Sequence, residues 1–230
     1  MNEIRTELKE VIQSIKSYLE AERDSGVEGY YREPQVGLSP KVVKEGLLKE
    51  LHKKVSGCKA CRLYETRSNL VFGSGNPDAA LMFIGEAPGK EEDAQGLPFV
   101  GDAGKMLTNI IAAMGYKRED VYIANCLKCR PPMNRSPLMD ELITCEPNLI
   151  EQIEIVKPKV ICCLGRFAAQ LLLKSTVAIS KLRGKFYDYH GIKLMPTFHP
   201  AYLLRNPGDK RLVWDDMKKL KKELEKLKSE

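Results

Sequence analysis

The feature that most constrains the fold is the alternation of short apolar runs with longer helical patterns after about residue 57. Four apolar runs have the length of a strand: Ala80–Ile84, Val121–Asn125, Val160–Leu164 and Lys193–Pro196. Patterns with helical spacing lie between and after them, at about 102–114, 138–156, 166–173 and 209–228. Nearly continuous apolar strands separated by helices are typical of a mostly parallel sheet with both faces covered. The alternation therefore predicts an α/β domain.

The segment before this alternation follows a different pattern. A helix is predicted over 3–22, where apolar residues recur every three or four positions, and the stretch that follows has the glycines and proline of a linker. A second helix is predicted to begin at Ser39-Pro40, a capping serine followed by proline at the first helical position. Its expected apolar stripe is Val43, Leu47, Leu51 and Val55. We expect 1–38 to be a helical extension with a linker, and 39–230 to be the main domain.

Composition places the chain among soluble globular proteins, with 43% hydrophobic and 30% charged residues. No apolar run approaches the roughly 20 residues that a membrane span needs, and the beginning of the chain carries a charged helical pattern instead of an apolar signal core. We therefore expect a cytoplasmic, monomeric protein with no membrane association. The net charge of +6 suits an anionic partner such as nucleic acid.

Seven cysteines in a chain expected in the cytoplasm favour metal ligands or buried thiols over structural disulfides. Cys58 and Cys61 form a C-x₂-C pair just past the second helix, a spacing at which two thiolates bind one metal centre. Cys129, in the loop after a predicted strand, and Cys145, on the next predicted helix, are candidates to complete a set of four. Spacing alone leaves open a [4Fe–4S] cluster, a tetrahedral zinc, and unrelated free thiols at the last two positions.

Two of the three other cysteines have a simpler interpretation. Cys162 and Cys163 lie inside the apolar run Val160–Leu164. Cysteine is frequently a small buried hydrophobe, so core packing is expected for both.

Three predicted strands end in groups suited to binding a ligand. Gly85–Gly89 follows the first strand, and glycines let backbone N–H groups approach a ligand closely at the strand ends where open α/β sheets bind. Asn125 ends the second strand, and its amide can donate one hydrogen bond and accept another, which matches O4 and N3–H of uracil. His199 follows the last strand, directly before Pro200. A turn-capping asparagine and a surface histidine are the simpler alternatives.

Taken together and in order, several segments resemble the family 4 uracil-DNA glycosylases of thermophilic bacteria and archaea. They are Gly85–Gly89, Gly96–Gly101, Asn125–Pro132 and His199–Arg205, and the resemblance covers about residues 45–220. It implies a three-layer sandwich with a central parallel four-stranded sheet flanked by helices. It also implies a [4Fe–4S] cluster on Cys58, Cys61, Cys129 and Cys145. The implied activity is the hydrolytic removal of uracil from single- or double-stranded DNA, which leaves an abasic site.

The resemblance further implies roles for single residues. Phe99 is expected to stack on the flipped uracil, Asn125 to read its Watson–Crick edge, and His199 to donate a hydrogen bond to its O2. Backbone groups of Glu86 and Ala87 are expected to line the pocket and to help place the water.

Two carboxylates of the first motif have further expected roles. Glu92 is a candidate for the side chain that excludes the methyl group of thymine. The first motif has Ala87 where the best-known uracil glycosylases have a water-positioning aspartate, which leaves Glu86 and Asp93 as candidates to activate the water. Glu86 is favoured.

DNA contacts are expected around the last motif and the loop after the second strand. Leu203 is the candidate for an apolar wedge that fills the space of the flipped base, the alternative being a core leucine. Candidate phosphate contacts are Arg205, Arg135, Arg130, Lys128 and Lys105. Residues 1–40 are expected to extend the DNA contact, to pack, or to bind a replication clamp or polymerase.

Three alternative functions remain at this point. A related base-excision glycosylase with a different base preference is disfavoured by Glu86, because that group tends to lack the polar residue of the first motif. A variant that traps its product through histidine would need an inserted basic loop, and none lies between His199 and Trp214. A non-catalytic iron–sulfur module that binds nucleic acid is the alternative from a different class.

Overall fold

A computed structural model describes residues 12–14, 16–17, 20 and 39–229. Backbone contacts divide the chain into two units, Met1–Leu38 and Ser39–Glu230, and the second unit holds the elements described below. The described positions within the predicted helix over 3–22 are helical, and the rest of that helix lies outside the described residues.

The second unit is built on a six-stranded sheet in the order β1-β3-β2-β4-β6-β5. Its four central strands are parallel and are, in sheet order, β3 (Tyr122–Asn125), β2 (Leu81–Gly85), β4 (Val160–Leu164) and β6 (Ile192–Thr197). The short strands β1 (Ser74–Gly75) and β5 (Tyr187–Tyr189) add one antiparallel edge each. The α/β class and the four parallel strands are confirmed. The sheet has six strands, however, and not the four that were expected. The edge strands have only two and three residues, too few to show a period in the sequence.

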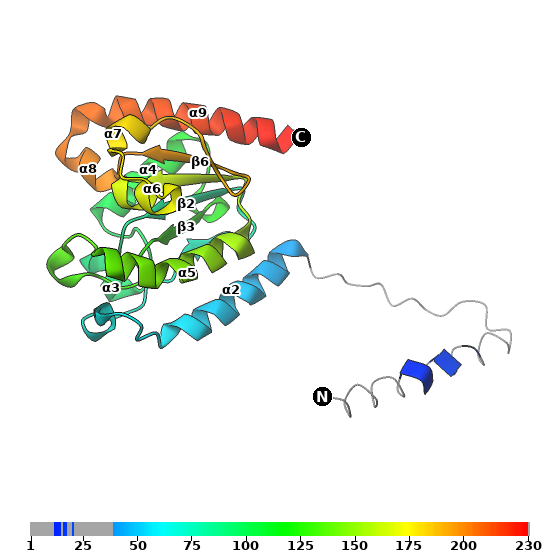
Figure 1. Cartoon of the computed structure of the whole chain (residues 1–230). Coiled ribbons are helices and arrows are strands. Elements are labelled where there is room, and N and C mark those ends of the chain that lie inside the picture. The colour runs from blue at the N-terminus through cyan, green and yellow to red at the C-terminus, as the bar shows by residue number, and fades with distance from the viewer. Residues whose placement is uncertain (1–11, 15, 18–19, 21–38, 230) are drawn as a thin grey trace. The chain divides into compact units, whose positions relative to one another are not determined.

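Helices cover both faces of this sheet. They are α2 (Pro40–Ser56), α3 (Lys90–Gln95), α4 (Asp102–Ala113), α5 (Met139–Val156), α6 (Arg166–Leu173), α7 (Ile179–Leu182), α8 (Pro200–Arg205) and α9 (Lys210–Ser229). One core cluster joins the sheet to α2, α5, α6 and α7, and a second joins the other face to α4, α8 and α9. Figure 1 shows α2 and α5 side by side, with α9 along the opposite side of this unit. Within the described residues no helix combines the length and apolar character needed to cross a bilayer.

Burial on both faces explains why the central strands are apolar throughout. In β2, Met82 and Ile84 belong to one core cluster, and Leu81 and Phe83 belong to the other. In β4, Cys163 and Cys162 divide between the two clusters in the same way, and both are fully buried. Successive side chains of a strand point to opposite faces, so a sheet between two helical layers buries every position. The prediction of core packing for these two cysteines is confirmed.

Helix α2 begins as predicted, but its buried face is different. Ser39 is the N-cap, its hydroxyl accepts the Val42 N–H, and Pro40 is the first helical residue. Leu48, rather than Leu47, is buried, together with Leu51 and Val55. Steps of four residues exceed the 3.6-residue helical turn, so a stripe made only of such steps drifts away from the core. The predicted stripe is therefore wrong in its first half.

Candidate active site and cysteine cavity

A cleft of about 550 Å³ opens at the carboxyl ends of the four parallel strands. It is lined by Glu86, Ala87, Pro88, Gly89, Glu92, Phe99, Ala103, Asn125, Pro131, Asn134, Arg135, Ser136, Arg166, Phe167, His199, Ala201, Tyr202 and Arg205. These residues come from the segments that follow β2, β3, β4 and β6. The volume is that of a small-molecule site, at the sheet edge where α/β proteins bind ligands. The structure thus brings all predicted pocket residues together.

Asn125 ends β3 and lies at the floor of the cleft. The residue is 1% exposed. Within the described residues, its Oδ1 is one of two buried side-chain polar atoms that have no hydrogen-bond partner. Buried acceptors are normally satisfied, and one that is not calls for an explanation such as an absent ligand. The turn-capping alternative does not account for an unsatisfied side-chain oxygen.

Phe99 lies against Asn125 and has a strained backbone. Its φ is 52°, a left-handed conformation that bulky residues rarely adopt. Two glycines allow this placement. A Cβ at Gly85 would lie 2.4 Å from both Asn125 Oδ1 and Phe99 Cζ, and a Cβ at Gly104 would lie 2.0 Å from the Phe99 carbonyl oxygen. The glycines of these two segments therefore make room for the phenylalanine and the asparagine.

His199 caps helix α8 and faces Phe99. The Ala201 N–H donates to Nδ1 of His199 over 3.1 Å, and the ring centroids of Phe99 and His199 are 5.7 Å apart. Because Nδ1 accepts, the proton of the neutral ring lies on Nε2. Burial, and secondarily the charge of Arg205, lowers the pKa of His199 to about 4. His199 is thus a neutral imidazole that carries its N–H on the nitrogen not used by the helix.

Glu92 holds the two glycine-rich segments together. Its carboxylate accepts backbone hydrogen bonds from Gly89, Val100 and Gly101 over 2.9–3.1 Å. Both oxygens are therefore engaged in fixing the loops that carry the cleft wall. The exclusion of a thymine methyl by this side chain stays a prediction. Asp93 was the second carboxylate considered as the group that activates the water. It is 3% exposed and accepts hydrogen bonds from the backbone N–H groups of Ser68 and Asn69, so it holds α3 against the segment at 68–69.

Glu86 is the carboxylate that remains available in the cleft. Burial raises its pKa, and the charge of Arg166 opposes that rise. Arg166 lies at the start of α6, with its guanidinium 4.3 Å from the centroid of the Phe167 ring. Arg166 was not predicted from the sequence. The signal that could have found it is Gly165 directly after the strand Val160–Leu164, which repeats the strand–glycine junction of the first motif.

Residues near the cleft bear on two predictions, the apolar wedge at Leu203 and the phosphate contact at Arg135. Leu203 is 1% exposed and packs in the core, so it cannot act as a wedge without leaving the interior, whereas Leu204 is 45% exposed. Arg205 and Arg135 both line the cleft as predicted. Arg135 is already held by Glu141, which accepts two hydrogen bonds of 2.9 and 2.6 Å from its guanidinium.

The predicted phosphate contact at Lys128 is wrong. Lys128 is 1% exposed, and its Nζ donates to buried oxygens instead of facing solvent. The other two candidates, Lys105 and Arg130, are exposed or partly exposed and pair with Asp102 and Asn134 respectively. Lys128 lies between a strand end and a candidate ligand cysteine, where the tertiary structure buries it and no local sequence pattern indicates that it is buried.

The four predicted ligand cysteines line one cavity. Cys58 and Cys61 come from the segment after α2, Cys129 from the loop after β3, and Cys145 from α5. Arg67, which sequence reasoning missed, donates from Nη1 to Cys129 Sγ over 3.0 Å. Burial raises the pKa of Cys129 to about 11, and the charge of Arg67 opposes that rise. Within the described residues, no three His, Cys, Asp or Glu side chains stand at the spacing of a single metal ion.

Comparisons with known proteins agree with this geometry. The model of the uracil DNA glycosylase superfamily matches residues 72–222. The type-4 uracil-DNA glycosylase of Thermotoga maritima is 45% identical over 187 residues, which cover 80% of this chain and 97% of that protein. Those of Saccharolobus solfataricus and Archaeoglobus fulgidus are 46% and 42% identical, over 74% and 75% of this chain and 83% and 91% of their own lengths. The chain therefore belongs to the uracil DNA glycosylase superfamily, among its type-4 members.

Proposed function

We propose that this protein removes uracil from DNA by hydrolysing its N-glycosidic bond, releasing free uracil and leaving an abasic site. The observation that carries the proposal is the unsatisfied Oδ1 of Asn125 beside Phe99, in a cleft that also presents the Nε2–H of His199. An acceptor, an aromatic face and a donor are the groups that a planar base with N3–H and two carbonyls requires. Membership of the family supports this assignment.

Recognition begins when the nucleotide leaves the base stack. Flipping costs a few kcal/mol, and stacking of the base on Phe99 offsets about 1–3 kcal/mol of that cost. Phe99 and Asn125 both adjoin Gly85 in the wall of the cleft, so a base that enters meets the aromatic ring and the amide together. Asn125 Oδ1 then accepts the uracil N3–H, and Nδ2 donates to O4. Cytosine has no proton on N3 and has an amino group in place of O4, so it leaves both amide groups mismatched.

Bond cleavage places negative charge on the departing uracil, chiefly at O2. The Nε2–H of His199 donates to this oxygen and stabilises the charge as it develops. Removing one such donor typically costs about 10²–10³ in rate. The neutral ring suits this role because its Nδ1 is occupied by the Ala201 N–H, which fixes both the tautomer and the ring orientation.

Water attacks C1′ of the oxocarbenium-like sugar that cleavage leaves. Glu86 is the group proposed to orient this water and accept its proton. The pKa of Glu86 is raised by burial, which makes its carboxylate a stronger base than an exposed one. The positive charge of Arg166 opposes this rise in the pKa of Glu86. A lysine nucleophile is not needed, because hydrolysis proceeds without a Schiff base.

The cysteine cavity is proposed to hold a [4Fe–4S] cluster. Four thiols around one cavity, with the Arg67 guanidinium beside Cys129, fit four-thiolate ligation. The residues that would hold the cluster are Cys58, Cys61, Cys129 and Cys145. The cluster would supply a structural cross-link between segments far apart in the sequence.

DNA binding is proposed to involve Arg205, Arg135 and Arg166 at the cleft, with Leu204 replacing Leu203 as the apolar wedge. We also propose that the protein acts as a monomer, which light scattering can check. Contact of residues 1–40 with a replication clamp or polymerase stays a prediction, since most of that segment lies outside the described residues.

The decisive test is a glycosylase assay on oligonucleotides with one uracil, single-stranded and paired with guanine or adenine. We expect release of uracil and an alkali-labile abasic site from each of these substrates. The same strands carrying thymine, hypoxanthine or cytosine are the specificity controls. DNA binding without cleavage by cluster-replete protein would support the non-catalytic alternative, and preferential release of hypoxanthine would support the alternative base preference.

Replacement of Asn125 by Asp tests the recognition step within the same assay. The carboxylate cannot donate to O4, so we expect slower uracil release and a smaller preference for uracil over cytosine. An unchanged preference would show that another group reads the base.

A further inference from the structure

Lys128 is a buried lysine placed between the cleft and the cysteine cavity. It follows Asn125 by three positions and directly precedes Cys129. The residue is 1% exposed and lines the same cavity as the four cysteines. Lysine is almost never fully buried without a partner, because removing an unpaired ammonium from water is costly. Its partners therefore decide what it does.

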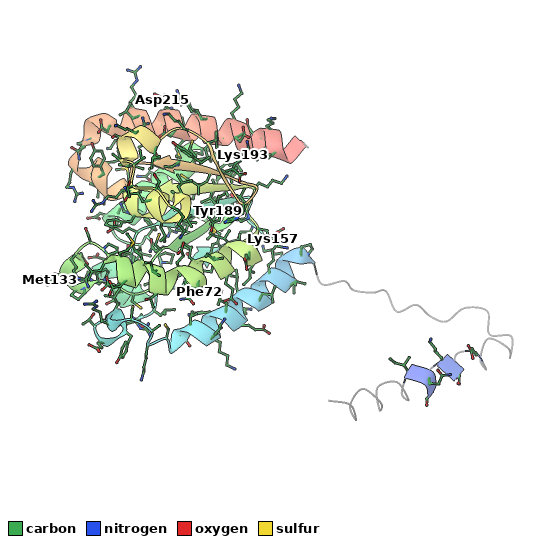
Figure 2. The ribbon with its side chains drawn as sticks, in the orientation of Figure 1. Phe72, Met133, Lys157, Tyr189, Lys193 and Asp215 are labelled. Atoms are coloured by element: carbon green, nitrogen blue, oxygen red, sulfur yellow. The ribbon has the colours of Figure 1, made fainter. Side chains whose placement is uncertain are left out.

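The side chain of Lys128 folds back onto the strand end that carries Asn125. Its Nζ donates to the Asn125 carbonyl oxygen over 2.8 Å and to Gln152 Oε1 over 2.5 Å. Gln152 is fixed in turn, because its Nε2 donates to the Phe72 carbonyl oxygen over 2.9 Å. Figure 2 shows Phe72 between α2 and α5. The ammonium thus holds the main chain of Asn125 against the helix that carries Cys145.

The main chain between the two sites leaves little freedom for independent movement. The Cys126 N–H donates to the Gly85 carbonyl and the Leu127 N–H donates to the Glu86 carbonyl, both over 3.0 Å. The Lys128 carbonyl accepts the Val71 N–H over 2.8 Å, and its backbone N–H hydrogen-bonds the Cys145 thiol. A displacement of the cysteine cavity is therefore transmitted to both Asn125 and the first motif through the short segment 125–129 and its hydrogen bonds.

Charge explains why the residue at this place is a lysine. Both acceptors of its Nζ are neutral oxygens, so neither balances the ammonium. The groups that share the cavity with it are thiols, which lose their protons when they bind metal. Four thiolates outweigh the positive charge of a [4Fe–4S] core, so a loaded site would have a net negative charge and would act as the counter-ion of Lys128.

We propose that Lys128 is a positioning residue that couples the loaded cysteine site to uracil recognition, because the same ammonium balances the charge of that site and fixes the main chain of Asn125. This inference rests on the proposed function for its base-recognition half. Its other half, the pairing of Lys128 with the loaded cysteine site, is independent of activity.

The test compares the iron-loaded wild-type protein with Lys128→Met, which keeps most of the side-chain volume and removes the charge. We expect the midpoint reduction potential of the cluster to become more negative, because a nearby positive charge that favours the added electron is lost. We also expect the inhibition constant of free uracil to rise about tenfold, as for the loss of a charged buried hydrogen bond. The DNA KM should stay within about twofold while kcat falls.

Two further variants keep the outcome interpretable. Lys128→Arg retains the charge with a different reach, so we expect a potential near that of the wild type and weakened uracil inhibition. If Lys128→Met does not fold or load iron, the uracil inhibition of Lys128→Arg tests the proposal in its place. Lys193→Met is the control for removing a lysine charge, since Lys193 is exposed on β6 and lies at the other end of the sheet from Met133 and the cleft loops (Figure 2).

The outcomes distinguish a failure of the Lys128 proposal from a failure of the proposed function. Iron-replete Lys128→Met protein with an unchanged reduction potential, or with unchanged inhibition by uracil, overturns the proposal. A wild-type protein that does not release uracil refutes the proposed function, and the reduction potentials of the variants still test the pairing of Lys128 with the cysteine site.

Discussion

At the scale of single residues, the cleft is defined by groups whose bonding is incomplete or constrained. Asn125 Oδ1 lacks a partner, Phe99 has a left-handed backbone conformation, and His199 has only one ring nitrogen engaged. Each condition has a cost in the free protein. Strained or unsatisfied groups of this kind are usually found where binding of a ligand offsets their free-energy cost.

The protonation of His199 can be measured directly. We expect the ring to remain neutral, with its proton on Nε2, from about pH 8 down to about pH 5, because its pKa is lowered to about 4. Since the pKa is lowered, the charged ring forms only as the pH falls toward that value, and uracil release should show no step from His199 near pH 6.5. Nitrogen-15 NMR of labelled histidine, with His199→Gln for assignment, checks this. A titration near pH 6.5 with a protonated Nδ1 would contradict the expectation.

At the scale of elements, helix α8 shows how one turn divides its roles. His199 caps the helix and faces the cleft, Leu203 points into the core, and Leu204 points into solvent. Adjacent residues of a helix are about 100° apart, so one of two neighbouring leucines is buried and the other is free. The sequence motif names both leucines, but only the packing of α8 tells them apart.

Replacement of Leu204 by Ala is expected to slow uracil release from duplex DNA by roughly tenfold, because a wedge compensates for unstacking. Release from single-stranded DNA should change by less than about twofold, because little stacking is lost there. Steady-state kinetics on matched single- and double-stranded oligonucleotides measure both effects. Leu212→Ala is the control, since Leu212 is comparably exposed on α9. Equal slowing on both substrates would argue against a wedge.

At the scale of the whole molecule, the cysteine cavity joins parts that are distant in the chain. It connects the end of α2, the loop after β3 and the middle of α5. The first and last of its cysteines, Cys58 and Cys145, are separated by more than a third of the sequence. A cross-link over so long a loop reduces the entropy of the unfolded chain strongly.

Replacement of Cys58 by Ser is expected to remove most of the bound iron and to lower the free energy of unfolding by about 3–5 kcal/mol, by analogy with other cross-links over long loops. Iron analysis together with denaturant unfolding checks both. Cys162→Ala is the control, since Cys162 is buried in β4 away from the cavity lining and should keep the iron despite some loss of packing. Retention of iron and stability in Cys58→Ser protein would refute the cross-link.

The parts of the fold that could be predicted are those with a long period or a local signal. Four parallel strands and the helices between them follow from apolar runs of four or five residues, and α2 begins at its serine–proline cap. The two edge strands were missed because two or three residues show no period. Asn125, His199 and the segment Gly85–Gly89 were found at strand ends, and Phe99 and Glu92 through the family resemblance. Arg166 in the cleft and Arg67 in the cysteine cavity were found by neither route.

The sequence by itself determined the class of fold, the four candidate ligand cysteines and the cleft residues that belong to the recognised motifs, because each depends on local spacing or on a motif. Only the tertiary structure decided which leucine of α8 is exposed and which oxygen of Asn125 lacks a partner. It also decided that Lys128 is buried between the cleft and the cysteine cavity. The physical reason is that burial, hydrogen-bond satisfaction and charge balance depend on what neighbouring elements bring to a residue, and those neighbours are distant in the chain.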